Sequence, residues 1–155
     1  MPELYQPRLE DLWFKAQLLG DEQTMSYNHA WDRTIAFPES RWAAWYDRWI
    51  VHHEGKRFYR YIRADGVFVG EAAYHFDEEQ QIYLADVIIF AAHRGKGYGR
   101  AGLQLLCDSA RARGVTELYD SIASDNPGVA LFLHYGFEEV LRTGEYILVR
   151  KSLTD

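Results

Sequence analysis

The spacing of apolar residues predicts two helices in the first third of the chain. The first helix follows a short predicted strand over 4–6 and ends at Gly20. Its apolar residues at helical spacing are Leu9, Leu12, Trp13 and Ala16. Residues 21–38 have no clear period, so we expect a long ordered loop there. The second helix follows this loop, and its residues at i, i+3, i+4 and i+7 form one aromatic stripe of Trp42, Trp45, Tyr46 and Trp49.

The pattern then changes to the alternation that is typical of strands. Residues 58–64 and 67–76 flank Asp65-Gly66, which is a strong hairpin signal. Gly70 lies inside the second of these strands and indicates either a bulge or a close approach of two backbones. A third long strand is predicted over 81–90. It becomes continuously apolar at its end, which is typical of burial on both faces.

The remaining elements complete one mixed α/β domain over residues 1–155. A helix that follows a glycine-rich loop ends at Gly114, and a short helix begins at Asn126, with Pro127 at its first position, and ends at Gly136. Further strands are predicted over 117–123, 138–141 and 146–149, the last two joined by a turn at Thr143-Gly144. The chain contains no internal repeat and no linker-like segment.

Composition limits the class of protein. Nearly half of the 155 residues are hydrophobic and 15% are aromatic, which indicates a folded domain. The formal net charge of −6 argues against nonspecific nucleic-acid binding and either suits a cationic partner or aids solubility. Cys107 is the only cysteine, so we expect a core residue, with no disulfide framework and no cysteine metal site. No signal peptide or membrane span is evident, so we expect a cytoplasmic protein with no membrane partner.

The segment Arg94-Gly95-Lys96-Gly97-Tyr98-Gly99 carries the most informative chemistry. It lies between an apolar strand and a helix, where backbone N–H groups converge at a helix N-terminus and favour a phosphate. Glycine leaves room for a ligand against the backbone, and the two basic side chains add formal charge. The segment therefore predicts a site for a cofactor that bears a pyrophosphate.

Two other phosphate-binding loops fit less well. Residues 97–102 match the dinucleotide-binding motif G-x-G-x-x-G, and Asp120 lies near the position along the chain at which that fold places its ribose-binding acid. In that fold, however, the strand turns tightly into the first glycine of the motif, whereas six residues lie between the strand and Gly97 here. A P-loop requires Ser or Thr after Gly-Lys, whereas Gly97 follows Lys96 here. An ordinary strand-to-helix turn explains one or two glycines, but not three at alternate positions with two cations among them.

The ordered pair of motifs resembles the GNAT-type N-acetyltransferase family. Arg94-x-x-Gly97-x-Gly99 resembles its acetyl-coenzyme A motif, and Asn126 followed by a short helix and Gly136-Phe137 resembles its second signature. The resemblance covers 81–140 well. It implies a central twisted mixed sheet of six or seven strands with helices on both faces. It also implies a splayed parallel pair in the middle, and acetyl-coenzyme A (acetyl-CoA) as co-substrate in the gap.

The resemblance also implies which residues contact the cofactor. Backbone groups near Val87 and Ile89 would bond the pantetheine arm, and the N–H groups of residues 95–99 would hold the pyrophosphate. Asn126 would contact the arm or fix the neighbouring strand, and Phe132 would lie beside the thiol end. The full predicted set is Val87, Ile89, Arg94, Gly95, Lys96, Gly97, Tyr98, Gly99, Asn126 and Phe132.

The implied reaction is direct attack of an amine on the thioester, which requires a base and no covalent enzyme intermediate or metal. Many family members place a proton-donating Tyr where this chain has Phe132 or Leu133, so Tyr135, a turn later, is the substitute candidate. Some family members also place a basic Glu on the strand before the loop, where this chain has Tyr83. The base candidates are Glu71, His75, Asp86 and Asp120. Glu71, next to Gly70, is preferred, and Asp120 shares a strand face with apolar residues, which predicts burial and a shifted pKa.

The acceptor site is predicted from the loop between the first two helices. Tyr27 and Trp31 lie in that loop and are the preferred acceptor contacts, whereas the stripe from Trp42 to Trp49 is more typical of core packing. Small amines, amino-acid-like metabolites, aminoglycosides and peptide amines all fit as acceptors. Three functions stay open: an acetyltransferase, which in this family is often a homodimer; a non-catalytic coenzyme A-binding sensor; and a nucleotide-binding oxidoreductase.

Overall fold

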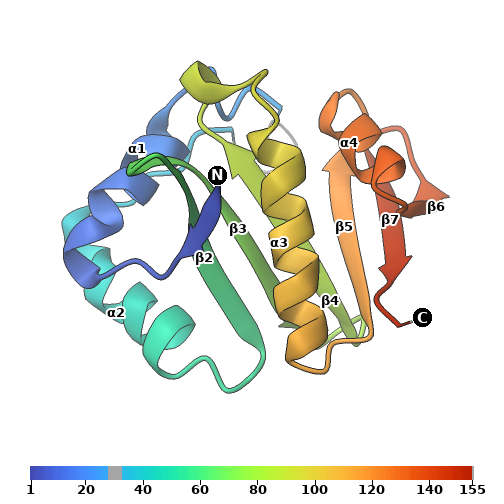
Figure 1. Ribbon diagram of the computed structural model, residues 1–155, viewed down its shortest axis with the longest axis horizontal. Coiled ribbons are helices and arrows are strands. Elements are labelled where there is room, and N and C mark those ends of the chain that lie inside the picture. The colour runs from blue at the N-terminus through green and yellow to red at the C-terminus, as the bar shows by residue number, and fades with distance from the viewer. Residues whose placement is uncertain (28–32, 155) are drawn as a thin grey trace.

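The fold is built on one seven-stranded mixed sheet, seen in a computed structural model that describes residues 1–27 and 33–154 (Figure 1). The spatial order of the strands is β1-β2-β3-β4-β5-β7-β6, and β4 and β5 are the parallel pair. This arrangement confirms the expected sheet and excludes a doubly wound dinucleotide fold, because the other neighbours are antiparallel. The strands are β1 Glu3–Tyr5, β2 Arg57–Ala64, β3 Val67–Asp77, β4 Ile82–Ile89, β5 Glu117–Ala123, β6 Glu138–Arg142 and β7 Tyr146–Ser152.

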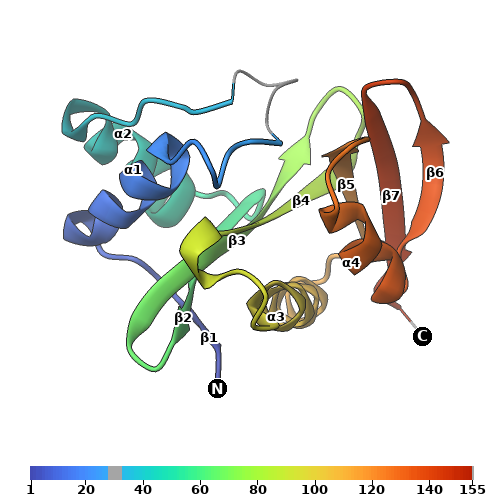
Figure 2. The same cartoon turned by 90° about the horizontal axis from the view of Figure 1, so that it is seen from above.

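Helices cover both faces of this sheet (Figure 2). On one face, α1 and α2 pack over β2, β3 and β4, with Phe14 and Leu18 against Tyr59 and Tyr61. On the opposite face, α3 and α4 enclose the larger core, which includes Leu106 and Phe132. The helical segments are η1 Leu9–Leu12, α1 Trp13–Gly20, η3 Glu39–Arg41, α2 Trp42–Tyr46, η4 Asp47–Val51, η5 Ala91–His93, α3 Tyr98–Ala112 and α4 Gly128–His134.

The hairpin between β2 and β3 follows from local sequence. Asp65 and Gly66 both have positive φ, 52° and 77°, as a two-residue hairpin turn requires. Both expectations for Gly70 hold: the register shifts beside its partner Ile62, and a Cβ at Gly70 would collide with the carbonyl oxygen of Ile88. Gly70 therefore allows β3 and β4 to approach closely at the edge of the site.

Other elements differ from the sequence-based expectation in length and regularity. The second helix is a 3₁₀ turn, a short α-helix and a π-helical turn in succession, and its aromatic stripe is half-buried. Trp45 and Trp49 pack against Tyr59, so the stripe lies over the sheet without becoming a closed core. The first helix begins as a 3₁₀ turn. The short helix was expected to begin at Asn126 with Pro127 at its first position, but α4 begins at Gly128 and Pro127 is its N-cap.

Cys107 is fully buried in α3, which confirms its expected place in the core. None of the helices among residues 1–27 and 33–154 has the length and apolarity needed to cross a membrane.

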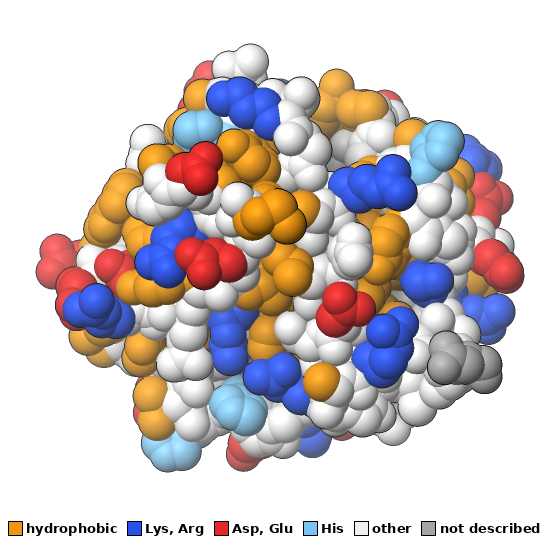
Figure 3. Space-filling model, in the orientation of Figure 1, with side chains coloured by type: hydrophobic (Ala, Val, Ile, Leu, Met, Phe, Trp, Pro, Cys, Tyr) orange, Lys and Arg blue, Asp and Glu red, His pale blue; other side chains and the backbone are white. Residues whose placement is uncertain are grey.

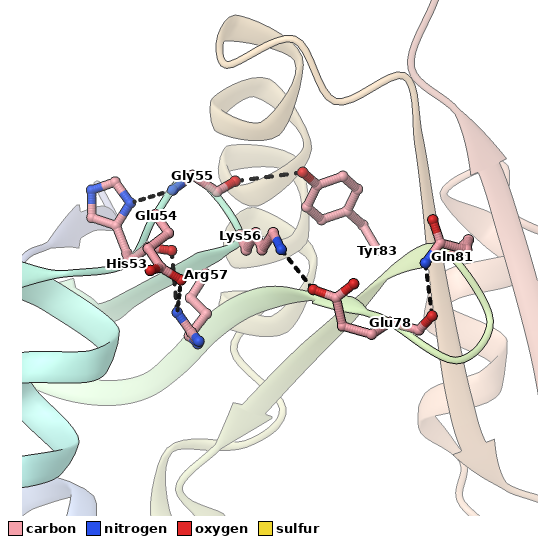
Figure 4. A network of polar contacts seen from close by, with 8 residues as sticks. All are labelled: His53, Glu54, Gly55, Lys56, Arg57, Glu78, Gln81 and Tyr83. Carbon is pink, nitrogen blue, oxygen red and sulfur yellow. Dashed lines mark hydrogen bonds and ion pairs between the residues drawn. The ribbon is translucent and has the colours of Figure 1, made fainter.

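The turn between β3 and β4 is fastened to the segment that precedes β2 (Figure 4). Lys56 Nζ lies 2.6 Å from Glu78 Oε1, and the side chain of Gln81 donates to the Glu78 carbonyl at 2.7 Å. Tyr83, in β4, donates its hydroxyl to the carbonyl of Gly55 at 3.4 Å. These contacts hold in place the turn between β3 and β4, which carries Gln80.

Candidate active site

A cavity of about 830 Å³ runs along the gap between β4 and β5. The two strands are in register only at Leu84 and Tyr119 and diverge beyond that point, as the expected splay requires. The cavity extends from the loop before α3 to the N-terminus of α4. Because β4 has no ladder partner on its β5 side after Leu84, the main chain near Val87 and Ile89, which line the cavity, is open to a ligand there.

The glycine-rich loop forms one end of the cavity. Gly95 and Gly97 have φ of 81° and 83°, and Gly97 is the N-cap of α3, with no side chain to cap the helix. The first N–H groups of this 15-residue helix therefore face the cavity end without an internal partner. A Cβ at Gly99 would lie 3.2 Å from Leu131, so the helix packs closely against α4.

Lys and Arg side chains are dispersed over the face that carries α3, and some of them lie at the end of the molecule that holds this loop (Figure 3). Lys96 and Arg100 are both exposed there. Free N–H groups, the positive end of the α3 dipole and formal positive charge together favour a diphosphate. The residues present therefore fit the cofactor that the sequence predicts, with Gly95, Gly97, Tyr98 and Gly99 lining the cavity.

Arg94 lines the cavity and also has partners within the protein. Its guanidinium donates to the carbonyl oxygens of Thr24, at 2.8 Å, and Gln23, at 3.5 Å. The Thr24 hydroxyl in turn accepts from the N–H of Ala91 at 2.8 Å and donates to the Asp21 carboxylate. Arg94 and Thr24 thus fasten the segment 21–27 to the cofactor loop, and Thr24, Met25 and Tyr27 become part of the cavity wall.

Asn126 and Phe132 line the cavity from the side of α4. The Asn126 side chain accepts from the N–H of Gly128 at 2.8 Å, so it orders the start of α4. Phe132 is buried, and its ring centroid lies 5.0 Å from that of Phe137. This placement puts an apolar wall where the resemblance implies the thiol end of the cofactor.

Two carboxylates line the cavity from opposite faces of the sheet. Asp86 pairs with Ala73, which packs under α1 and α2, whereas Asp120 pairs with Val149 in the core beneath α3 and α4. The Asp86 side chain is exposed to the cavity. Partial loss of hydration in the gap between the strands, followed by the charge of Glu71, raises its pKa to about 7, against a smaller opposing effect of Lys15. Burial, followed by the charge of Asp86, raises the pKa of Asp120 well above its usual range.

Glu71, the base preferred from sequence, is not among the residues that line the cavity. It is only 3% exposed and accepts hydrogen bonds from Lys15 Nζ at 3.3 Å and from the Tyr59 hydroxyl. Lys15 Nζ lies 4.6 Å from the ring centroid of Tyr59 and 4.9 Å from that of Trp45. Of the aromatic stripe over 42–49, Trp45 therefore contacts a cation of the chain itself.

Some of the other predicted site residues line the cavity and others do not. Tyr135 is the C-cap of α4, beneath Lys151 Nζ at 5.6 Å, and is not among the residues that line the cavity. Tyr27 lines the cavity, and Trp31 lies outside the described residues. His75 also lines it, with a pKa lowered chiefly by burial. Thr24 and Met25 were not expected, because an aperiodic loop gives no local signal of its contacts.

Comparisons with known proteins agree with this geometry. A model of the acetyltransferase (GNAT) family matches residues 18–137. The chain is similar to streptothricin acetyltransferase from Streptomyces lavendulae, with 32% identity over 78 residues, which is 49% of this chain and 41% of that protein. The match thus spans less than half the length of this relative.

Solved structures of the same fold extend over nearly the whole chain. Spermidine N-acetyltransferase from Vibrio cholerae, in complex with coenzyme A and spermine, has a TM-score of 0.80 and 19% identity, covering 98% of this chain and 95% of that one. The structure of yncA from Salmonella typhimurium, with its cofactor acetyl-CoA, has a TM-score of 0.75 and 21% identity, covering 100% and 95%. Since the family model spans most of the domain and includes both motifs, the chain belongs to the GNAT acetyltransferase family.

Proposed function

We propose that this protein is an N-acetyltransferase that moves the acetyl group of acetyl-CoA to a primary amine by direct attack on the thioester. One observation supports the proposal above all: a single cavity joins a glycine-rich loop with unpartnered N–H groups at the N-terminus of α3 to a carboxylate whose pKa is near neutrality. In this arrangement the N–H groups of residues 95–99 hold the diphosphate, and the open edge of β4 binds the pantetheine arm.

Asp86 is the proposed base. It borders the cavity, whereas Glu71 is buried and already neutralised by Lys15. An alkylammonium has a pKa of roughly 10 and must lose a proton before it attacks. Asp86 takes that proton, and the amine nitrogen forms a bond to the carbonyl carbon as the carbon–sulfur bond breaks. The nitrogen then gives up a second proton to solvent and becomes the neutral amide. A base with a pKa of about 7 is ionised enough at neutral pH to act and still basic enough to accept the proton.

Asp120 is the proposed acid for the departing thiolate. Its raised pKa means that the carboxyl group keeps its proton to a higher pH than an ordinary Asp. It approaches the cavity from the face opposite to Asp86, which suits a reaction in which the amine enters on one side and the sulfur leaves on the other. In each turnover Asp86 therefore gains a proton and Asp120 loses one.

Isothermal titration with acetyl-CoA, combined with free-thiol release across a panel of primary amines, tests this proposal. Binding together with amine-dependent thiol release is the expected result. Binding without such release from any amine would instead favour a non-catalytic sensor of coenzyme A. The specific observation behind that alternative is Phe132, which has no hydroxyl where many relatives in the family place a proton donor.

A further inference from the structure

A second cavity, of about 290 Å³, opens beside the candidate active site. It shares Gln80, Leu84 and Ser121 with the larger cavity, so the two spaces adjoin at these residues. It lies over β5, β7 and β6 on the face of the sheet where α1 and α2 cover only β2, β3 and β4 (Figure 2). A ligand held at Asp86 can therefore extend into it without crossing the sheet.

The floor of the second cavity is apolar. Leu84 and Leu148 are half-buried, and Leu141, which pairs with Leu148 across β6 and β7, is 47% exposed. Leu84 lies two residues before Asp86 on the same face of β4. An alkyl segment that begins at Asp86 would cover these side chains and remove apolar surface from water.

Two turns form the walls, and both are held by hydrogen bonds. The β3–β4 turn, which carries Gln80, is fastened by the contacts of Lys56 and Tyr83 described above (Figure 4). In the β6–β7 turn, the Thr143 hydroxyl accepts from the N–H groups of Glu145 and Tyr146. Because both walls are already ordered, a ligand binds here at a smaller entropic cost.

Glu145 is the one acidic side chain among the described residues that line this cavity. Arg142 is paired with Glu139 at 2.6 Å, and Arg150 lies 3.8 Å from Glu117. Glu145, which lines the cavity, has no ion pair or side-chain hydrogen bond among residues 1–27 and 33–154. The local charge complements a cation.

We propose that the second cavity binds the far end of the acceptor, and that the acceptor is an extended amine with a second ammonium group that pairs with Glu145. This inference rests on the proposed function. The alkyl segment lies over Leu84 and Leu148, and Gln80 and Ser121 supply further polar contacts. From the strand spacing, Asp86 and the far wall are on the order of 10–15 Å apart, which corresponds to roughly eight to twelve bonds between the two nitrogens.

A series of linear α,ω-diamines, each compared with the monoamine of the same chain length, tests the subsite. For the full chain, we expect kcat/KM to be roughly five- to tenfold higher for a diamine of matching length than for its monoamine. In Glu145→Gln the preference should fall to less than about twofold through the KM of the diamine, with the monoamine unaffected. Glu79→Gln removes the same charge from the facing turn and should leave the preference unchanged, because Glu79 does not line the cavity.

Equal rates for diamines and monoamines at every length would overturn the subsite, and so would a preference that survives in Glu145→Gln. A second readout separates this failure from failure of the proposed function. If no amine releases thiol, calorimetric titration of the same diamines into the coenzyme A complex still decides the matter. Weaker binding in Glu145→Gln than in Glu79→Gln supports the subsite, and equal binding contradicts it.

Discussion

At the scale of single residues, the position of Asp86 at the cavity distinguishes it from Glu71. Glu71 is the base that the sequence favours, and both residues lie on long strands of the same hairpin. The difference arises from what each side chain meets: Glu71 is enclosed with Lys15 and Tyr59, and Asp86 borders the cavity. Register places the two carboxylates on one face, so the charge of the buried one raises the pKa of the other.

Asp86→Asn is expected to lower kcat/KM by roughly 100- to 10,000-fold, because it removes the proposed base. A base acts in its ionised form, so activity of the unmodified protein should rise with pH through about 7. The pH profile of the variant should have no inflection near pH 7, and should keep only the rise in activity that comes from deprotonation of the amine substrate. A pH profile of thiol release measures both effects, and Asp65→Asn in the β2–β3 turn, outside the cavity wall, is the control. An unchanged inflection near pH 7 would rule out Asp86.

At the scale of elements, local signals predicted what local contacts determine. The Asp65-Gly66 turn, the strand over 117–123 and the glycine-rich loop all follow from neighbouring residues, and the structure agrees with each. The partner of Arg94 could not be predicted, because Thr24 lies 70 residues earlier in an aperiodic segment. Lys15 likewise meets Trp45 and Tyr59 only after α1, α2 and β2 pack together.

The loop before α3 makes a separable prediction about cofactor binding. Gly97→Val forces a β-branched residue into φ of 83° and places its side chain beside the free N–H groups of the helix. We expect weaker binding of coenzyme A in calorimetry and a loss of about 1–2 kcal/mol of unfolding free energy. Gly114→Val is a matched control, since Gly114 has φ of 85° just beyond the opposite end of α3. It should lose similar stability and keep its affinity, and equal affinity in both variants would exclude the assigned loop.

The link between Arg94 and Thr24 predicts a second separation of effects. Arg94→Ala should speed amide hydrogen exchange across residues 21–27 and at Ala91, because it removes the donor to the Thr24 and Gln23 carbonyls. Affinity for coenzyme A should change by less than about threefold, since the guanidinium is already committed within the protein. Lys96→Ala should show the reverse, with weaker cofactor binding and unchanged exchange. A large loss of affinity in Arg94→Ala with normal exchange would instead make Arg94 a phosphate ligand.

At the scale of the whole molecule, the buried pair of Lys15 and Glu71 joins the helical layer to the sheet. Lys15 comes from α1, Glu71 from β3, and Trp45 of α2 packs over the ammonium group. The two side chains are 10% and 4% exposed, so the removal of one leaves the other charge buried without its partner. The pair therefore fixes where α1 and α2 lie over the sheet.

Removal of one partner is expected to cost much more stability than removal of both. Glu71→Gln or Lys15→Met alone should lower the unfolding free energy by roughly 3–5 kcal/mol in urea titrations, because a buried charge is left uncompensated. The double variant should lose clearly less than the sum of the two, which is the signature of a direct interaction. Thiol release measured on the folded fraction completes the argument. If Glu71→Gln were as stable as the unmodified protein yet inactive, the catalytic base would be Glu71. The assignment of the base to Asp86, which faces the cavity, would then be wrong.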